Sequence, residues 1–209
     1  MWTEGMTARR VLLSLASMII LVYGVVEGST QKVTSTKNEF GGSTVEEVYP
    51  TEDTESNDIV KIISYYDDSN RCIKKDRIFT KKSADENGFN RIIVYLDTNE
   101  KPVKREFFYT DKSANENGFN RIIVYLDTNE KPVKREFFYT DKSANENGFN
   151  RIIIYLDTNE KPVKREFFYT DKSANENGFN RIIIYLDINE KPVKTELYMN
   201  DSLLKTDYE

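Results

Sequence analysis

The chain of 209 residues contains no histidine and a single cysteine, Cys72. Histidine is the commonest general base and the commonest metal ligand, so a Ser-His or Cys-His dyad cannot form within this chain. Zinc sites need Cys, His or carboxylate ligands, and only one thiol and scattered acids remain to supply them. We therefore expect no enzymatic activity, no cofactor and no metal site.

Glycine and proline are also scarce, with 9 and 5 residues, whereas tyrosine and phenylalanine number 13 and 12. This profile favours strands over disorder. Apolar residues make up 38% and charged residues 31%, which suits a thin, elongated core better than a thick one. The formal net charge of −5 gives no electrostatic support for nucleic acid as a partner.

Only one long apolar run occurs, at residues 11–26, and it follows Arg9 and Arg10. Small residues then precede a possible cut after Gly28, so residues 1–28 are predicted to be a signal peptide and the protein to be secreted or held at the cell surface. The run is short for a membrane span of about 20 residues. An uncleaved signal is therefore the only membrane attachment that the sequence predicts.

Residues 29–60 hold two lysines and seven acidic residues, with few apolar ones. This composition is typical of a solvated segment that has too little apolar area to form a core. We predict a flexible acidic leader over residues 29–60.

The rest of the chain is a repeat of thirty residues. The second and third copies are identical, and the fourth differs from them only by Ile154. The first and last copies have diverged, as end caps of an array do because their outer faces meet water. The predicted units are 61–90, 91–120, 121–150, 151–180 and 181–209. The unit 91–120 has five cations and five anions, so added copies build up no net charge.

Each unit predicts two strands, at 91–96 and 103–110 in the second copy. Residues 97–101 read as a turn, and Pro102 suits the start of a strand because it has no N–H to donate. Residues 111–118 are predicted to form a longer polar loop, with Gly118 at positive φ. The continuous apolar run at 92–96 fits no helical stripe.

The predicted fold is all-β, with tandem antiparallel β-hairpin repeats that form an elongated, twisted sheet of about ten strands. The alternative is a parallel β-solenoid with one coil per unit. A solenoid would stack identical charges about 4.8 Å apart, and their repulsion favours the hairpins. In the predicted register Leu96 faces Val103, Val94 faces Arg105 and Ile92 faces Phe107, which separates an apolar face from a charged one.

The apolar face is the predicted binding surface, because one layer of strands does not cover both of its faces and exposed apolar patches mark interaction sites. Its residues are Val94, Leu96, Arg105, Phe107 and Tyr109, with the equivalents Arg135, Phe137, Tyr139, Arg165, Phe167 and Tyr169. Residues 113–118 do not match a calcium loop, since Val124 stands where such a loop has its glutamate.

Two further residues are candidates for covalent modification. Cys72 has no partner in the chain, so it is a candidate for an intermolecular disulfide. Asn200 begins the sequon Asn-Asp-Ser and is a candidate for glycosylation.

The sequence thus predicts a secreted interaction module of the effector, surface-antigen or adhesive type, whose repeats multiply weak contacts with an unidentified protein or cell-surface partner. The alternative is a structural or matrix protein that self-associates through its sheet.

Overall fold

The computed structural model describes residues 32–49 and 58–209. The predicted signal peptide, 1–28, lies outside these residues. The described chain forms thirteen strands: β1 Lys32–Lys37, β2 Gly41–Val48, β3 Ile59–Asp67, β4 Cys72–Phe79, β5 Phe89–Leu96, β6 Pro102–Tyr109, β7 Phe119–Leu126, β8 Pro132–Tyr139, β9 Phe149–Leu156, β10 Pro162–Tyr169, β11 Arg181–Leu186, β12 Pro192–Met199 and β13 Ser202–Tyr208. Four short helices join them: α2 Lys81–Asn87, α3 Asp111–Asn117, α4 Asp141–Asn147 and α5 Asp171–Asn177.

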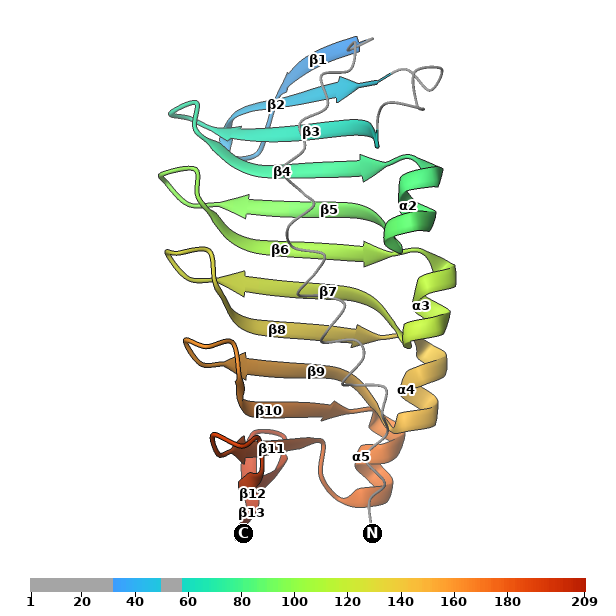
Figure 1. Cartoon of the computed structure of the whole chain (residues 1–209), viewed down its shortest axis with the longest axis vertical. Coiled ribbons are helices and arrows are strands. Elements are labelled where there is room, and N and C mark those ends of the chain that lie inside the picture. Colours follow the sequence, from blue (N-terminus) through green and yellow to red (C-terminus); the bar gives the residue numbers. More distant parts are fainter. Residues whose placement is uncertain (1–31, 50–57) are drawn as a thin grey trace.

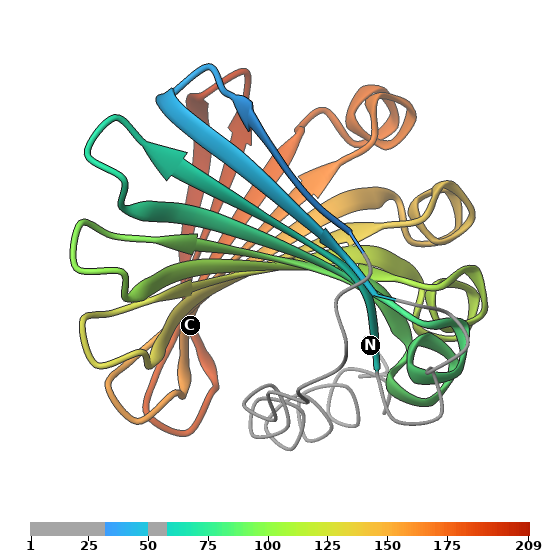
Figure 2. The ribbon, with the colours of Figure 1, turned by 90° about the horizontal axis from the view of Figure 1, so that it is seen from above.

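All thirteen strands lie in one open sheet in the order of the sequence, and every neighbouring pair is antiparallel. The strands stack along the long axis, and the helices form a column at one end of the strands (Figure 1). Seen along that axis, the sheet twists strongly (Figure 2). The prediction of tandem hairpins in an elongated sheet is confirmed, and the parallel solenoid is wrong.

The sheet has three strands more than the ten predicted. The hairpin of β1 and β2 lies within residues 29–60, so the prediction of a flexible leader does not hold for residues 32–48. The turn of this hairpin is tied to the array, because the Asn38 amide donates to the carbonyls of Ser43 and Tyr66, both at 2.8 Å. Glu46 on β2 pairs with Lys61 on β3 at 2.8 Å. The third additional strand, β13, pairs with β12 at the other end of the array.

The prediction of a polar loop at 111–118 is wrong, since residues 111–117 form α3. Thr110 is the N-cap, with its hydroxyl accepting from the Ser113 N–H, and Asp111 places an acid in the first turn. Gly118 ends the helix at φ 82°, as expected for a glycine C-cap. The N-cap threonine and the C-cap glycine thus mark the two ends of this helix. Its seven residues are too few to show a helical repeat of apolar residues.

Consecutive helices are joined by a hydrogen bond from cap to cap. The Thr110 N–H donates to the Gly88 carbonyl, and the Thr140 N–H donates to the Gly118 carbonyl, both at 3.0 Å. Each glycine that ends one helix therefore helps to fix the residue that begins the next. This contact sets the helices at the same spacing as the hairpins.

Two bulges in each unit correct the predicted register. Ile92 faces Phe107 and Val94 faces Arg105, as predicted, but Leu96 faces Pro102 because Val103 is an extra residue. Val103 is 39% exposed as a result and does not join the apolar face.

The second bulge lies at Asn90, between the pairs Phe89–Tyr109 and Arg91–Phe108. It brings Phe89 onto the same face as Ile92, which strict alternation would forbid.

The apolar face is packed with aromatic rings that meet edge to face across neighbouring strands. Phe89, Tyr109, Phe119 and Tyr139 form a continuous row, with centroid separations of 6.5, 5.1 and 6.4 Å. Phe149, Tyr169 and Phe179 continue it. Edge-to-face pairs contribute about 0.5–1.5 kcal/mol each beyond the area they bury. The row therefore links each unit to the next.

Gly118 and Gly178 offer a matched test of the contact between helices. A Cβ at Gly118 would lie 2.5 Å from Ser143 Oγ on the next helix, whereas one at Gly178 would meet nothing within 4 Å. Alanine at either position is strained by about 1–2 kcal/mol because of the positive φ. We expect Gly118→Ala to lower the free energy of unfolding by roughly 1 kcal/mol more than Gly178→Ala does, as measured by urea denaturation.

The control repeats Gly118→Ala in a Ser143→Ala background, which removes the clashing oxygen. The additional loss should then disappear. If it persisted, the helices would not be in contact through this pair.

Candidate binding face

The charged face of the sheet is ordered in three rows that cross the strands. In the central units, Arg91, Ile93 and Tyr95 of β5 lie opposite Phe108, Glu106 and Lys104 of β6. The same pairs recur between β6 and β7 and down the array. One row thus alternates arginine with an aromatic residue, the middle row alternates glutamate with isoleucine, and the third alternates lysine with tyrosine.

Cations stack on rings in both outer rows. The Arg121 guanidinium lies 3.9 Å from the Phe138 ring centroid, and Arg151 lies 4.7 Å from that of Phe168. Lys104 Nζ lies 3.6 Å from the ring centroid of Tyr95. These contacts hold the long side chains flat against the sheet at a contribution of about 0.5–1 kcal/mol each. The cations are consequently ordered before any ligand arrives.

The glutamates of the middle row are buried, and their carboxylates pair with lysines and arginines of the two outer rows. Glu136 is 4% exposed and accepts from Lys134 Nζ at 2.8 Å and Arg151 at 2.9 Å. Burial by itself would raise the pKa of Glu136, but the Lys134 hydrogen bond and the Arg151 and Lys134 charges outweigh it and lower the pKa. One buried anion thus faces two cations in the two central units, at Glu106 and at Glu136.

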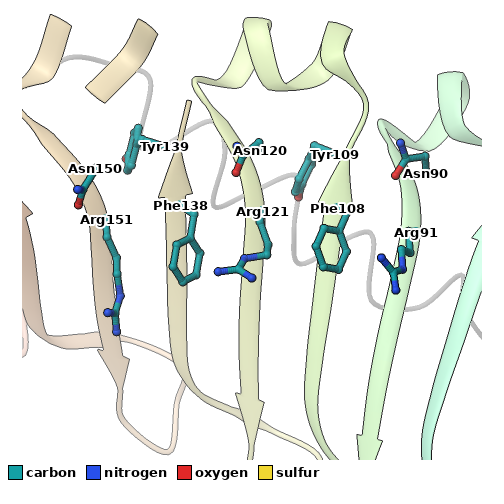
Figure 3. A pocket seen from close by; sticks show the side chains of 10 residues that line it. All are labelled: Asn90, Arg91, Phe108, Tyr109, Asn120, Arg121, Phe138, Tyr139, Asn150 and Arg151. Carbon is teal, nitrogen blue, oxygen red and sulfur yellow. The ribbon is translucent and has the colours of Figure 1, made fainter. Parts of the chain in front are cut away.

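A shallow groove of about 790 Å³ follows the arginine row on the side nearest the helices. Ten residues line it, in which an Asn-Arg pair occurs three times and a Phe-Tyr pair twice at intervals of thirty residues: Asn90, Arg91, Phe108, Tyr109, Asn120, Arg121, Phe138, Tyr139, Asn150 and Arg151. Figure 3 shows arginine and phenylalanine side by side from strand to strand, with the asparagines toward the helices.

The asparagines of the groove are the bulge residues and are exposed. Among the side chains of residues 32–49 and 58–209, none forms a hydrogen bond with the amides of Asn90, Asn120 or Asn150. Nε of Arg121 and Arg151 is buried and also lacks a partner within this part of the chain. The groove thus presents exposed asparagine amides at regular intervals, whereas Nε and Nη2 of its first arginine, Arg91, already donate to Asp76.

Most residues of the predicted binding surface lie instead in the core. Val94, Phe107 and Phe137 are buried, and Leu96, Tyr109 and Tyr139 pack against that cluster. Burial raises the pKa of Tyr139 to about 12, so its hydroxyl stays neutral at physiological pH. Phe167 and Tyr169 join the ring contacts around Phe149. Their binding role stays untested, and packing is the role that the structure gives them.

The arginines of the predicted surface are paired across units. Arg105 is 8% exposed and contacts Glu130 at 3.2 Å, in the turn of the following unit. The pairs Arg135–Glu160 and Arg165–Glu190 repeat this contact at 3.5 Å. The turn glutamates have φ near 60°, a conformation that favours glycine or asparagine. The ion pair thus coincides with a strained backbone position.

The equivalent of the turn glutamates in the first unit is Asn70, also at positive φ. Asparagine tolerates this conformation well. Alignment of the units, which places Asn70 opposite the turn glutamates, was therefore the one sequence signal that these glutamates have positive φ. The groove had a comparable signal, since Asn90 and Arg91 recur every thirty residues. It was missed because the strand was predicted to begin at Arg91.

The two predicted modification sites differ in access. Cys72 is free and only 3% exposed, which opposes an intermolecular disulfide without disproving it. Asn200 lies in the exposed turn before β13, where its side chain accepts from Asn180 Nδ2 at 3.2 Å. Glycosylation of Asn200 stays a prediction.

The part of the chain that the structure describes contains no group of three or more side chains suited to a metal ion. Within the same residues, no helix is long and apolar enough to cross a membrane.

No family model and no curated protein matches this chain. Among solved structures, it is similar at 10% identity to a mutant of S. aureus TarM, with a TM-score of 0.25 over 88% of this chain and 23% of that one. A domain from Vibrio parahaemolyticus described as a putative outer membrane lipoprotein-sorting protein domain gives a TM-score of 0.20 at 10% identity, over 85% of this chain and 76% of that one. Such low scores support no argument about fold or function.

Burial should protect the Cys72 thiol. Burial also raises the pKa of the thiol, which lowers its thiolate fraction. We expect Ellman's reagent to react with native Cys72 at least roughly tenfold more slowly than with the denatured chain, because local opening must come first. Equal rates, or a dimer on a non-reducing gel, would show that Cys72 is accessible.

Acid should weaken the array through Glu136 in the middle row of the charged face. A carboxylate whose pKa is lower in the folded chain contributes stability above the ordinary carboxyl pKa of about 4.3, and this is lost as the pH falls through the folded pKa. We expect Glu136→Gln to lower the free energy of unfolding by about 2 kcal/mol at pH 7 and to flatten its decline below about pH 4.

Urea unfolding at pH 7 and at pH 3 measures both effects. Glu146→Gln, on the exposed surface of α4, is the matched control and should change little at either pH. Equal effects of the two substitutions would contradict a special role for the buried carboxylate.

Proposed function

We propose that this chain is a secreted, multivalent binding protein that holds an extended partner along the groove beside its arginine row. The observation that supports this function is the recurrence of one set of side chains, Asn90, Arg91 and Phe108 in the first instance, in successive units along a single open groove. An array of like sites multiplies weak contacts, because each bound site raises the effective concentration of the partner at the next.

The division of the sheet supports the same proposal. The apolar face is occupied by packing between its own rings, whereas the arginines of the groove keep about a third of their side-chain surface exposed, at 33% for Arg121 and 34% for Arg151. In this proposal stability depends mainly on the apolar face and binding on the charged face, and Tyr109 and Tyr139 of the ring row contribute to both because they also line the groove. The number of units can change without altering the site within each unit.

A second candidate is self-assembly through the ends of the sheet. Strand β13 has no neighbour beyond it among the described residues, and it exposes Leu203, Leu204 and Tyr208. Unprotected edges of this kind favour pairing with another copy. Oligomers that grow with concentration and disappear when Leu203 and Leu204 are changed to lysine would favour this candidate.

Removal of residues 121–150 tests multivalent binding directly. Asn120 would then precede Arg151, so the new junction has the same residues as the old ones. The full chain is first tested for retention on a panel of immobilised extracellular proteins and polysaccharides. For any surface that binds it, we expect the shortened chain to bind roughly tenfold more weakly, because one site of several is lost. Surface plasmon resonance measures the change.

Circular dichroism and urea unfolding of the shortened chain establish that it still folds. If the shortened chain were retained as strongly as the full chain, the binding site would lie outside the repeat units. Complete loss of retention by a folded variant would indicate one unique site. Absence of retention of the full chain on every surface would refute the proposed function.

A further inference from the structure

The groove combines three chemistries in every unit. A guanidinium binds carboxylate or sulfate through two parallel hydrogen bonds. A free asparagine amide both donates to and accepts from hydroxyl groups. A phenylalanine ring offers an apolar surface to the C–H face of a sugar ring. Together, Arg121, Asn120 and Phe138 suit a ligand with acid groups, hydroxyl groups and ring faces.

Charge on this face favours an anionic ligand although the whole chain is acidic. Across β4 to β12 the face has nine cations and five carboxylates, a surplus of four positive charges: Lys74, Lys104, Lys134, Lys164, Lys194, Arg91, Arg121, Arg151 and Arg181 against Asp76, Glu106, Glu136, Glu166 and Glu196. The carboxylates are buried and the cations partly exposed, so the surplus faces the solvent.

The helices show the opposite balance. Asp111, Lys112 and Glu116 give α3 a net charge of −1, and α4 and α5 repeat it. A neutral unit is therefore polarised, with its positive side on the sheet face and its negative side at the helix column. An anionic chain would be attracted along the groove and repelled from the helices beside it.

The spacing of the arginines restricts the ligand further. Equivalent arginines lie two strands apart, which is about 9.6 Å in a sheet. Along the axis of a DNA duplex each strand carries one phosphate per about 3.4 Å, a denser spacing of charge than that of these cations. A polysaccharide with one acid group in each disaccharide places a neutral sugar between successive charges. That neutral sugar would lie beside Phe138, whose ring is stacked against the Arg121 guanidinium.

From these observations we propose that the groove binds a linear acidic polysaccharide, with one carboxylate or sulfate group at each of Arg121 and Arg151 and a third beside Arg91, where only Nη1 is left because Asp76 accepts from Nε and Nη2. This inference rests on the proposed binding function and names the chemical class of its ligand.

The test is calorimetric titration of the full chain with hyaluronan oligosaccharides of increasing length, which bear one carboxylate per disaccharide. Affinity should rise with length until the groove is spanned and should fall as salt is added. Arg121→Gln should weaken binding by roughly tenfold, and Arg121→Lys by less, because lysine keeps the charge but loses the paired donors. Lys142→Gln, an equal change of charge on exposed α4, is the matched control and should leave affinity unchanged.

Dextran, polyglutamate and single-stranded DNA separate the possible ligand classes. Dextran should not bind, and the two other polyanions should bind more weakly than hyaluronan and without a specific dependence on Arg121. If hyaluronan, polyglutamate and single-stranded DNA bound equally well, the groove would be a general cationic surface and the proposal would be overturned. If hyaluronan did not bind, the proposed ligand class would be overturned. The binding function would still stand if another immobilised protein or polysaccharide retained the chain, with a retention that falls when a repeat unit is removed.

Discussion

Edge-to-face packing of phenylalanine and tyrosine rings across neighbouring strands is the interaction on which this molecule depends. An open single-layered sheet has to bury one face with its own side chains, and here the rings pack around Ile92 and Ile122, which are fully buried. The row through Phe89, Tyr109, Phe119 and Tyr139 spans the gaps between strands and continues from unit to unit. The bulge at Asn90 is what brings Phe89 into that row. The same bulge exposes the asparagine that lines the groove, so the core and the candidate site share one backbone feature.

Other contacts between units are hydrogen bonds and ion pairs at the two ends of the strands. Cap-to-cap hydrogen bonds such as Thr140 to Gly118 join the helices, and pairs such as Arg105–Glu130 join the turns on the opposite side. Each of these contacts reaches from one unit to the next. Stability is therefore expected to grow with the number of units, as in other arrays with nearest-neighbour contacts. Identical units satisfy this requirement without new residues.

The sequence predicts those features that follow from alternation and repetition. The hairpins, the pairs Ile92–Phe107 and Val94–Arg105, and the left-handed Gly118 all follow from local pattern. Val103 was predicted to face Leu96, and Phe89 was left outside the predicted strands, because a bulge resets the alternation at each place and leaves no mark in composition. The helix at 111–117 was missed because two turns are too few to show a period. The predicted binding role of the apolar face stays untested, and the groove was missed because a row of large apolar residues indicates burial and binding equally well.

A face that packs the core and a face that could bind a ligand differ in how many of their polar groups lack a partner within the chain. On the apolar face, each arginine has an acid from the next unit, as Arg135 has Glu160. On the charged face, one buried carboxylate faces two cations, and the asparagines at the bulges are left without partners among the described side chains. Polar groups in that condition gain free energy when a ligand supplies the missing charge and hydrogen bonds. Because the identical units around Glu106 and Glu136 share this imbalance, it is a property of the repeated sequence, and the number of such units sets how many of these groups one partner can meet.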